Sequence, residues 1–168
     1  MRPDLIRHML RLLLVIGCGP HTYEATATDA GTNISLESNA VTVTVDPTNP
    51  ALDTDNSVTP GNLARNVSRR TNVKATFTEN FEMDEDTLVT NSTVQAPKAF
   101  TLVNMKTGAA VNATVSCDDP CLTVTLDPSV AKLAKRTLYK ATIATAAEDL
   151  AGNPLDAEKS WTFKTRRR

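Results

Sequence analysis

Two segments decide the fold: Tyr139-Lys140-Ala141-Thr142-Ile143 and Trp161-Thr162-Phe163-Lys164-Thr165. Apolar and polar side chains alternate in both, and a period of two places every apolar residue on one face of a strand. The same alternation occurs at 73–78, 100–103, 111–116 and 122–126, and a short edge strand is expected at 57–59. About seven antiparallel strands with one apolar face each predict an all-β sandwich.

Aromatic residues of these strands supply the expected core, with Phe77, Trp161 and Phe163 pointing inward. Tyr139 enters its strand two residues after Thr137, a spacing that predicts a tyrosine corner, in which the hydroxyl bonds to upstream backbone. Residues 128–135 are expected to form one short helical stretch at the crossover before this strand. Together these features favour an Ig-like Greek-key connection over a simple meander.

Composition excludes several function classes. The 168 residues carry a formal net charge of -1 and only 4% aromatic residues, so the chain lacks the overall basic charge and stacking surfaces of nucleic-acid binders. The two histidines, His8 and His21, precede the predicted sandwich, so no histidine-based catalytic triad can form within it. We therefore expect no catalytic residues and no enzyme activity. The apolar run at 12–16 is too short for a transmembrane segment.

The chain divides by composition into five segments. Residues 1–20 resemble a secretory or lipoprotein leader with Cys18 as the lipidated residue, and a misassigned start is the alternative. Residues 21–45 predict an orphan hairpin that needs further strands to be stable. The Pro/Asp-rich residues 46–56 are expected to be a linker, residues 57–165 the complete domain, and residues 166–168 a basic tail.

Several motifs follow one another in a fixed order: KATFTE at 74–79, Met83-Asp84 with Thr87, DLAGNPL at 149–155, and WTFKT at 161–165. They resemble the SbsA-type bacterial Ig-like domain, and residues 21–45 resemble the terminal hairpin of another bacterial Ig-like repeat. The resemblance implies a non-catalytic structural or spacer module of a secreted or cell-surface protein. Its expected partners are neighbouring repeats or cell-envelope components. The alternative is a carbohydrate- or protein-binding module that uses its loops, including one accessory to an extracellular enzyme.

Cys117 and Cys121 flank a turn of three residues. In a hairpin this spacing brings the two Cα atoms within reach of a disulfide, which is expected if the chain is exported to an oxidising compartment. A reduced pair is the alternative. Zinc is not expected, because a tetrahedral site needs four ligands and no second pair is present.

Calcium is the one cofactor for which the sequence offers ligands. Carboxylates occur in the linker at Asp53 and Asp55 and after an expected strand at Glu79 and Asp84. Hard cations prefer several oxygen ligands of this kind. Solvated loops are the simpler interpretation of both groups, and no other cofactor is expected.

Overall fold

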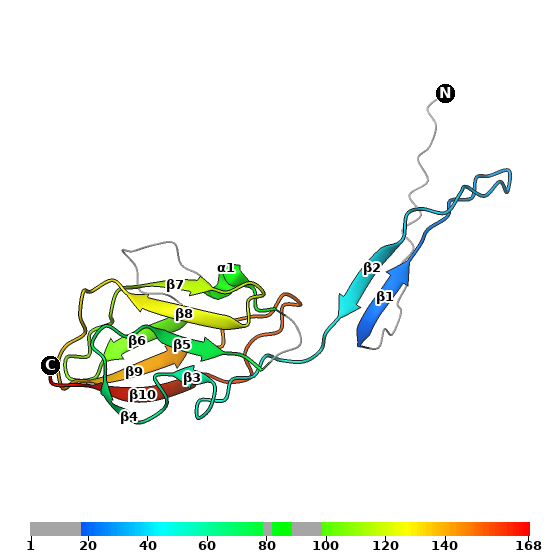
Figure 1. Cartoon of the computed structure of the whole chain (residues 1–168). Helices are drawn as coiled ribbons and strands as arrows, with labels where there is room; N and C mark the ends of the chain where they lie inside the picture. Colours follow the sequence, from blue (N-terminus) through cyan, green and yellow to red (C-terminus); the bar gives the residue numbers. More distant parts are fainter. Residues whose placement is uncertain (1–17, 79–81, 89–98) are drawn as a thin grey trace. The chain divides into compact units, whose positions relative to one another are not determined.

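The computed structural model describes residues 18–78, 82–88 and 99–168 (Figure 1). The chain divides between Asp46 and Pro47 into two compact units. In the first unit, β1 (Gly19–Tyr23) pairs antiparallel with β2 (Val41–Val45). The second unit contains the helix α1 (Glu85–Leu88) and the remaining strands. These are β3 (Val58–Thr59), β4 (Ala64–Val67), β5 (Val73–Thr76), β6 (Phe100–Asn104), β7 (Ala113–Cys117), β8 (Thr123–Pro128), β9 (Leu138–Ile143) and β10 (Lys159–Thr165).

The strands of the second unit form two four-stranded sheets, ordered β3-β5-β8-β7 and β4-β10-β9-β6, which lie in two layers (Figure 1). The order β3-β5-β8-β7 corresponds to strands A-B-E-D of an immunoglobulin sandwich, and the order β10-β9-β6 corresponds to strands G-F-C. The additional strand β4 pairs parallel with β10. The prediction of an all-β Ig-like sandwich is therefore confirmed.

Alternating side chains of the two sheets fill the core. Trp161 and Phe163 are 1% and 0% exposed, and Phe77 is also buried. The rings of Phe100 and Trp161 lie 5.8 Å apart between centroids, as do those of Tyr139 and Phe163. These separations are typical of favourable aromatic pairs. The indole nitrogen of Trp161 is buried and finds no hydrogen-bond acceptor in the part of the chain that the structure describes.

Tyr139 lies at the start of β9 with its ring in the core and its hydroxyl turned toward the preceding segment. The hydroxyl oxygen accepts a hydrogen bond from the Ala134 amide at 2.8 Å. Beside it, the Thr165 hydroxyl donates to the Ala134 carbonyl at 2.7 Å and accepts from the Thr137 amide at 3.0 Å. This is the geometry of a tyrosine corner, and it fixes the segment before β9 against the end of β10.

Two local expectations were wrong. Residues 128–135 are not helical: β8 continues to Pro128, and the Leu133 amide donates to the Arg69 carbonyl instead of to a helical neighbour. Strand β4 was also missed. It contains Asn66 in the left-handed region (φ 58°) and shows no alternation, so its sequence carries no strand signal.

The segment 46–56 differs from the expected linker because it packs against the second unit. Leu52 is buried in the core, and Ala51 bridges to Thr78, whose amide donates to the Ala51 carbonyl at 2.9 Å. The structure therefore extends the domain to Pro47.

The first unit is a hairpin with an apolar face. Its first strand begins at Gly19, two residues before the expected start of the hairpin at His21. Val41 and Val43 are 59% and 47% exposed in β2, and Leu36 is 93% exposed in the segment before it. Burial of such side chains is the main stabilising contribution in a β-sheet, so this hairpin retains apolar area that further strands would cover.

The same turn occurs in both units. In the first unit, Asp29 Oδ1 accepts from the amides of Gly31 and Asn33, and Oδ2 accepts from the Asn33 side chain. In the second unit, Asp149 makes the equivalent three bonds to residues 151 and 153, and backbone bonds of the two turns also correspond. Thr32 and Gly152, the fourth residues of the turns, are both left-handed. The hairpin of the first unit is thus the counterpart of the β9–β10 connection.

Candidate functional site

Four segments of the second unit meet at the end of the sandwich where β10 leaves it. Strand β4 runs parallel to β10 and ends beside it, whereas β9 runs antiparallel and begins there. The pairings of β5 with β8, β7 with β8 and β6 with β9 bring the other connections to the same end. We call this end, made of residues 68–72, 105–112, 129–137 and 166–168, the basic end. It contains no Asp or Glu, and its cations are Arg69, Arg70, Lys106, Lys132, Lys135, Arg136, Arg166, Arg167 and Arg168.

The opposite end has the reverse composition. Its described segments, 47–57, 82–88, 118–122 and 144–158, contain no Lys or Arg. We call it the acidic end, and its carboxylates are Asp53, Asp55, Glu82, Asp84, Glu85, Asp86, Asp118, Asp119, Glu148, Asp149, Asp156 and Glu158. The net charge of the chain is therefore near zero although positive and negative side chains lie at opposite ends of the domain.

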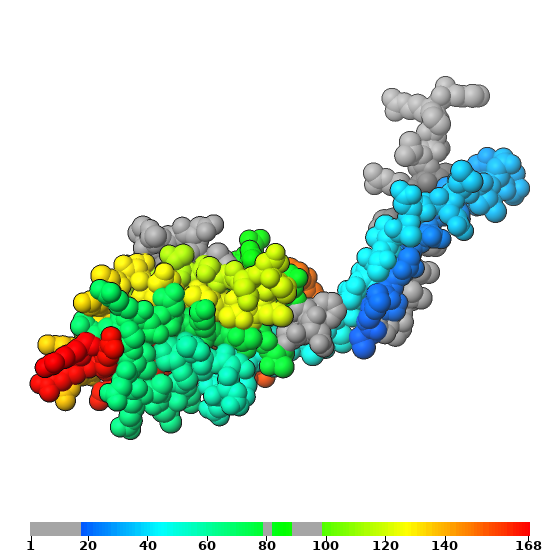
Figure 2. Space-filling model, viewed as in Figure 1, coloured from blue at the N-terminus to red at the C-terminus, as the bar shows by residue number. Residues whose placement is uncertain are grey.

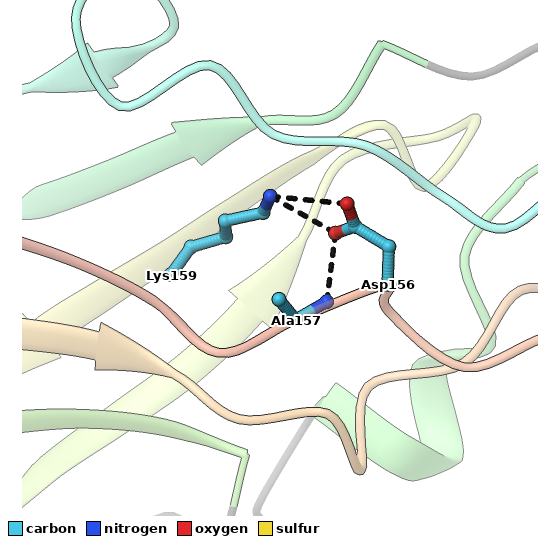
Figure 3. A network of polar contacts seen from close by, with 3 residues as sticks. All are labelled: Asp156, Ala157 and Lys159. Carbon is cyan, nitrogen blue, oxygen red and sulfur yellow. Dashed lines mark hydrogen bonds and ion pairs between the residues drawn. The ribbon is translucent and has the colours of Figure 1, made fainter.

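Ion pairing within the domain does not neutralise this separation. Among the residues described, the one salt bridge joins Lys159 Nζ to Asp156 Oδ1 at 3.0 Å, where β10 begins (Figure 3). Hydrogen bonding from Lys159, aided by the Ala157 amide, lowers the pKa of Asp156 below its ordinary value. The cations of the basic end form no ion pair with a described carboxylate, so their charge is available to a ligand.

A first basic cavity of about 290 Å³ opens at this end, and every residue that lines it is a cation. The lining residues are Arg69, Arg70, Lys132, Arg166 and Arg168. They come from the β4–β5 turn, the segment before β9 and the residues after β10. The last of these, at 166–168, lie exposed on the second unit and are drawn red in Figure 2.

A second basic cavity of about 370 Å³ lies near the same exit of β10. It is lined by Arg65, Asn66, Arg136, Lys164, Thr165 and Arg167. Asn66 and Arg136 both have left-handed backbones, with φ of 58° and 53°. Non-glycine residues in this region are uncommon and are found more often at functional sites.

Hydrogen bonds hold the basic segments together despite their like charges. Arg69 Nε donates to the Leu133 carbonyl at 2.6 Å, and the Leu133 amide donates to the Arg69 carbonyl at 2.7 Å. The Arg166 amide donates to the Val67 carbonyl, and its carbonyl accepts from the Arg136 amide. The backbone that carries the cations is therefore arranged before any ligand binds.

The structure does not gather the predicted calcium ligands into one site. Asp53 accepts from the Asp55 amide and from the Asn56 side chain, whose hydrogen bond is the main cause of the lowered pKa of Asp53. Asp84 accepts from the Asp86 amide at the start of α1. Glu79 lies outside the described residues. Within those residues, no three Asp, Glu, His or Cys side chains are grouped as a metal site requires.

Cys117 and Cys121 form a disulfide, with Cα atoms 5.2 Å apart, across the β7–β8 connection. Asp118 closes the same turn by accepting from the Leu122 and Thr123 amides. Cys18 has an exposed, unpaired thiol, and its lipidation stays a prediction.

The sequence analysis did not predict the basic end, because the net charge of the whole chain and the three arginines of the tail do not show how charge is divided among the connections. The signal was nevertheless present. Successive connections of an antiparallel sandwich lie at opposite ends, and the connections that are rich in Lys and Arg alternate with those that are rich in Asp and Glu.

The sheet order, the Greek-key path and the tyrosine corner together define the second unit as an Ig-like sandwich module. A family model described as a bacterial Ig-like domain matches residues 46–165. The chain belongs to this family. A search of curated protein sequences found no relative.

Solved structures are similar to this chain at low sequence identity. Domains 1–6 of the surface layer protein SbsC match with a TM-score of 0.50 and 20% identity, over 73% of this chain and 14% of that one. CopC from Methylosinus trichosporium OB3b matches with a TM-score of 0.49 and 15% identity, over 71% of this chain and 95% of that one. The chain thus spans about one seventh of the SbsC structure. No helix found in the described ranges has the length and apolar character of a membrane span.

Proposed function

We propose that the chain is a non-catalytic structural module of a secreted or cell-surface bacterial protein, in which Ig-like units follow one another as spacers. The recurrence of one turn in both units carries this proposal. Asp29 and Asp149 make the same three side-chain hydrogen bonds, and each lies six residues after the end of the strand that precedes it, β1 or β9. Such recurrence is expected when units of one kind are repeated along a chain.

The motifs that suggest the SbsA type have structural roles in this domain, which favours a structural interpretation of the module. Met83 is 1% exposed, and its amide donates to the Cys121 carbonyl. Asp84 caps α1, and the Thr87 hydroxyl accepts from the Glu148 amide at 3.1 Å. These contacts join α1 to two connections of the acidic end. We infer that the residues of this motif contribute to folding and not to catalysis.

The disulfide supports the proposed location. Bonds such as Cys117–Cys121 persist mainly in oxidising environments outside the cytosol. The same fold in the surface layer protein SbsC is compatible with that location, although fold alone does not define function.

Cell fractionation with thiol labelling tests the proposal. Cytoplasm, envelope and medium of a bacterium that produces the chain are separated, and Cys117 and Cys121 are alkylated before and after reduction. We expect the chain in the envelope or medium, with both thiols protected until reduction, and mass spectrometry of the N-terminal peptide reports whether the leader is removed. A cytoplasmic chain with two reactive thiols would contradict the proposed location.

A further inference from the structure

We propose that the basic end binds a linear polymer of the cell surface that carries phosphodiester groups. Five cations and no other residue line the first basic cavity. Four of the six residues that line the second are also cations: Arg65, Arg136, Lys164 and Arg167. No acid lies in the segments of this end, and Asp127 of β8, which lines a neighbouring cavity with Arg69 and Arg70, lines neither of these two. Nothing in the proposed spacer role requires such a concentration of unpaired charge.

Two cavities favour a polymer over a single small anion. Extended backbone directs successive side chains to opposite sides. Accordingly, Arg166 and Arg168 line the first basic cavity, while Arg167 between them lines the second. A chain of anions that passes the exit of β10 can contact both cavities, whereas an isolated phosphate fills only one.

The donors match phosphate. Seven of the cations that line the two cavities are arginines, and guanidinium groups form paired hydrogen bonds with phosphate and carboxylate oxygens. Five cations converge on the first cavity, which is more than one singly charged group can neutralise. Successive phosphodiesters of one polymer bring several charges, each shared by two oxygens that a guanidinium can contact as a pair.

Nucleic acid fits the site less well. Proteins that bind single strands usually stack bases on aromatic side chains. No aromatic residue lines either basic cavity, and Trp161 and Tyr139 are buried in the core. The site therefore contacts a backbone and does not recognise bases, as suits a polyol phosphate.

The acidic end gives the interaction a direction. Like charges repel, so a polyanion is repelled by the acidic end and attracted to the basic end of the same domain. We expect the module to meet the polymer end-on, with the β10 exit toward it. The inference that the polymer belongs to the cell surface rests on the proposed function. The affinity of the basic end for a phosphodiester polymer does not depend on the location of the chain.

Fluorescence anisotropy of the full 168-residue chain with labelled poly(glycerol phosphate) tests the inference across a salt series. The double variant Arg166→Gln/Arg168→Gln removes two cations of the first cavity. The control Lys74→Gln/Lys140→Gln changes the net charge equally with residues of β5 and β9 that lie outside the basic end and line neither cavity. Inorganic phosphate, oligothymidylate and a polyuronate of matched charge serve as comparison ligands.

We expect the Arg166/Arg168 variant to bind at least about ten-fold more weakly and to lose about two units of the log–log salt slope, because each phosphate contact contributes about one. The control should stay within about two-fold of the wild type. Equal weakening by both variants, or absence of binding by the wild type at low salt, would overturn the inference. So would tighter binding of oligothymidylate or polyuronate. Each of these results leaves the location experiment unaffected, so failure here is distinguishable from failure of the proposed function.

Discussion

Replacing Asp149 with alanine should destabilise the second unit by about 3 kcal/mol. The Asp149 side chain is 1% exposed and accepts three hydrogen bonds, from the Ala151 amide at 2.8 Å and from the backbone and side chain of Asn153 at 2.9 Å. Hydrogen bonds to charged groups contribute about 1.5–3 kcal/mol each, and bonds that share one acceptor group are not additive. Ala151 is exposed, so water can accept the hydrogen bond that its amide donates to Asp149 in the wild type and offset part of the destabilisation.

Trp161 is the one tryptophan of the chain and is buried in the core of the same unit, so its fluorescence reports unfolding in urea. With an m-value of about 2 kcal/mol per molar urea, the substitution lowers the midpoint by about 1.5 M. Asp149→Asn keeps an acceptor for the two backbone amides and should cost about 1 kcal/mol.

Asp29→Ala is the matched control. It removes the same three hydrogen bonds from the equivalent turn of the first unit, where the side chain is exposed. The Trp161 transition should not move, because Asp29 lies in the other compact unit. The reasoning fails if Asp149→Ala stays within about 1 kcal/mol of the wild type, or if Asp29→Ala shifts the transition equally.

Three further outcomes follow from the contacts. Tyr139→Phe should cost about 1 kcal/mol in the same urea assay, because the Ala134 amide loses its acceptor; an unchanged midpoint would remove the tyrosine corner as a stabilising feature. Reduction of Cys117–Cys121 should cost about 2 kcal/mol, since the closed loop is short, and calorimetry with and without reductant would contradict this if the two melts coincide. Lys159→Gln should raise the pKa of Asp156, measured by NMR titration, with less than about 0.5 kcal/mol lost because the pair is exposed. Because Lys159 lowers this pKa, the pair stabilises the fold at neutral pH, and the stabilisation disappears as the pH falls through the lowered pKa. A difference in stability between Lys159→Gln and the wild type that persists at acid pH would contradict the assignment.

The strands of the core could be predicted because burial on one face imposes alternation on the sequence. Ala141 pairs with Trp161 and Tyr139 with Phe163, which are the apolar positions of the two segments that first indicated a sandwich. The left-handed position at Gly152 is also encoded locally, by the residue type that tolerates it.

Features set by distant contacts could not be predicted in this way. Strand β4 exists because it pairs with β10, about a hundred residues later, and its own residues show no strand pattern. The segment before β9 carries short-range helical propensity, but its Leu133 amide bonds to Arg69 and its Ala134 amide to Tyr139. Tertiary hydrogen bonds overrode local propensity at both places.

The separation of charge shows why topology must be known before net charge is interpreted. In an antiparallel sandwich each strand carries the chain from one end to the other, so acidic and basic connections that alternate along the sequence are sorted to opposite ends. At an ionic strength of about 0.1 M, charge interactions decay over about 10 Å, so a ligand at one end senses that end and little of the other. A sum of -1 over 168 residues therefore says little about what the β10 exit attracts. The relevant quantity is the charge near Arg166 and Arg167, and every charged side chain that lines the two cavities there is a cation.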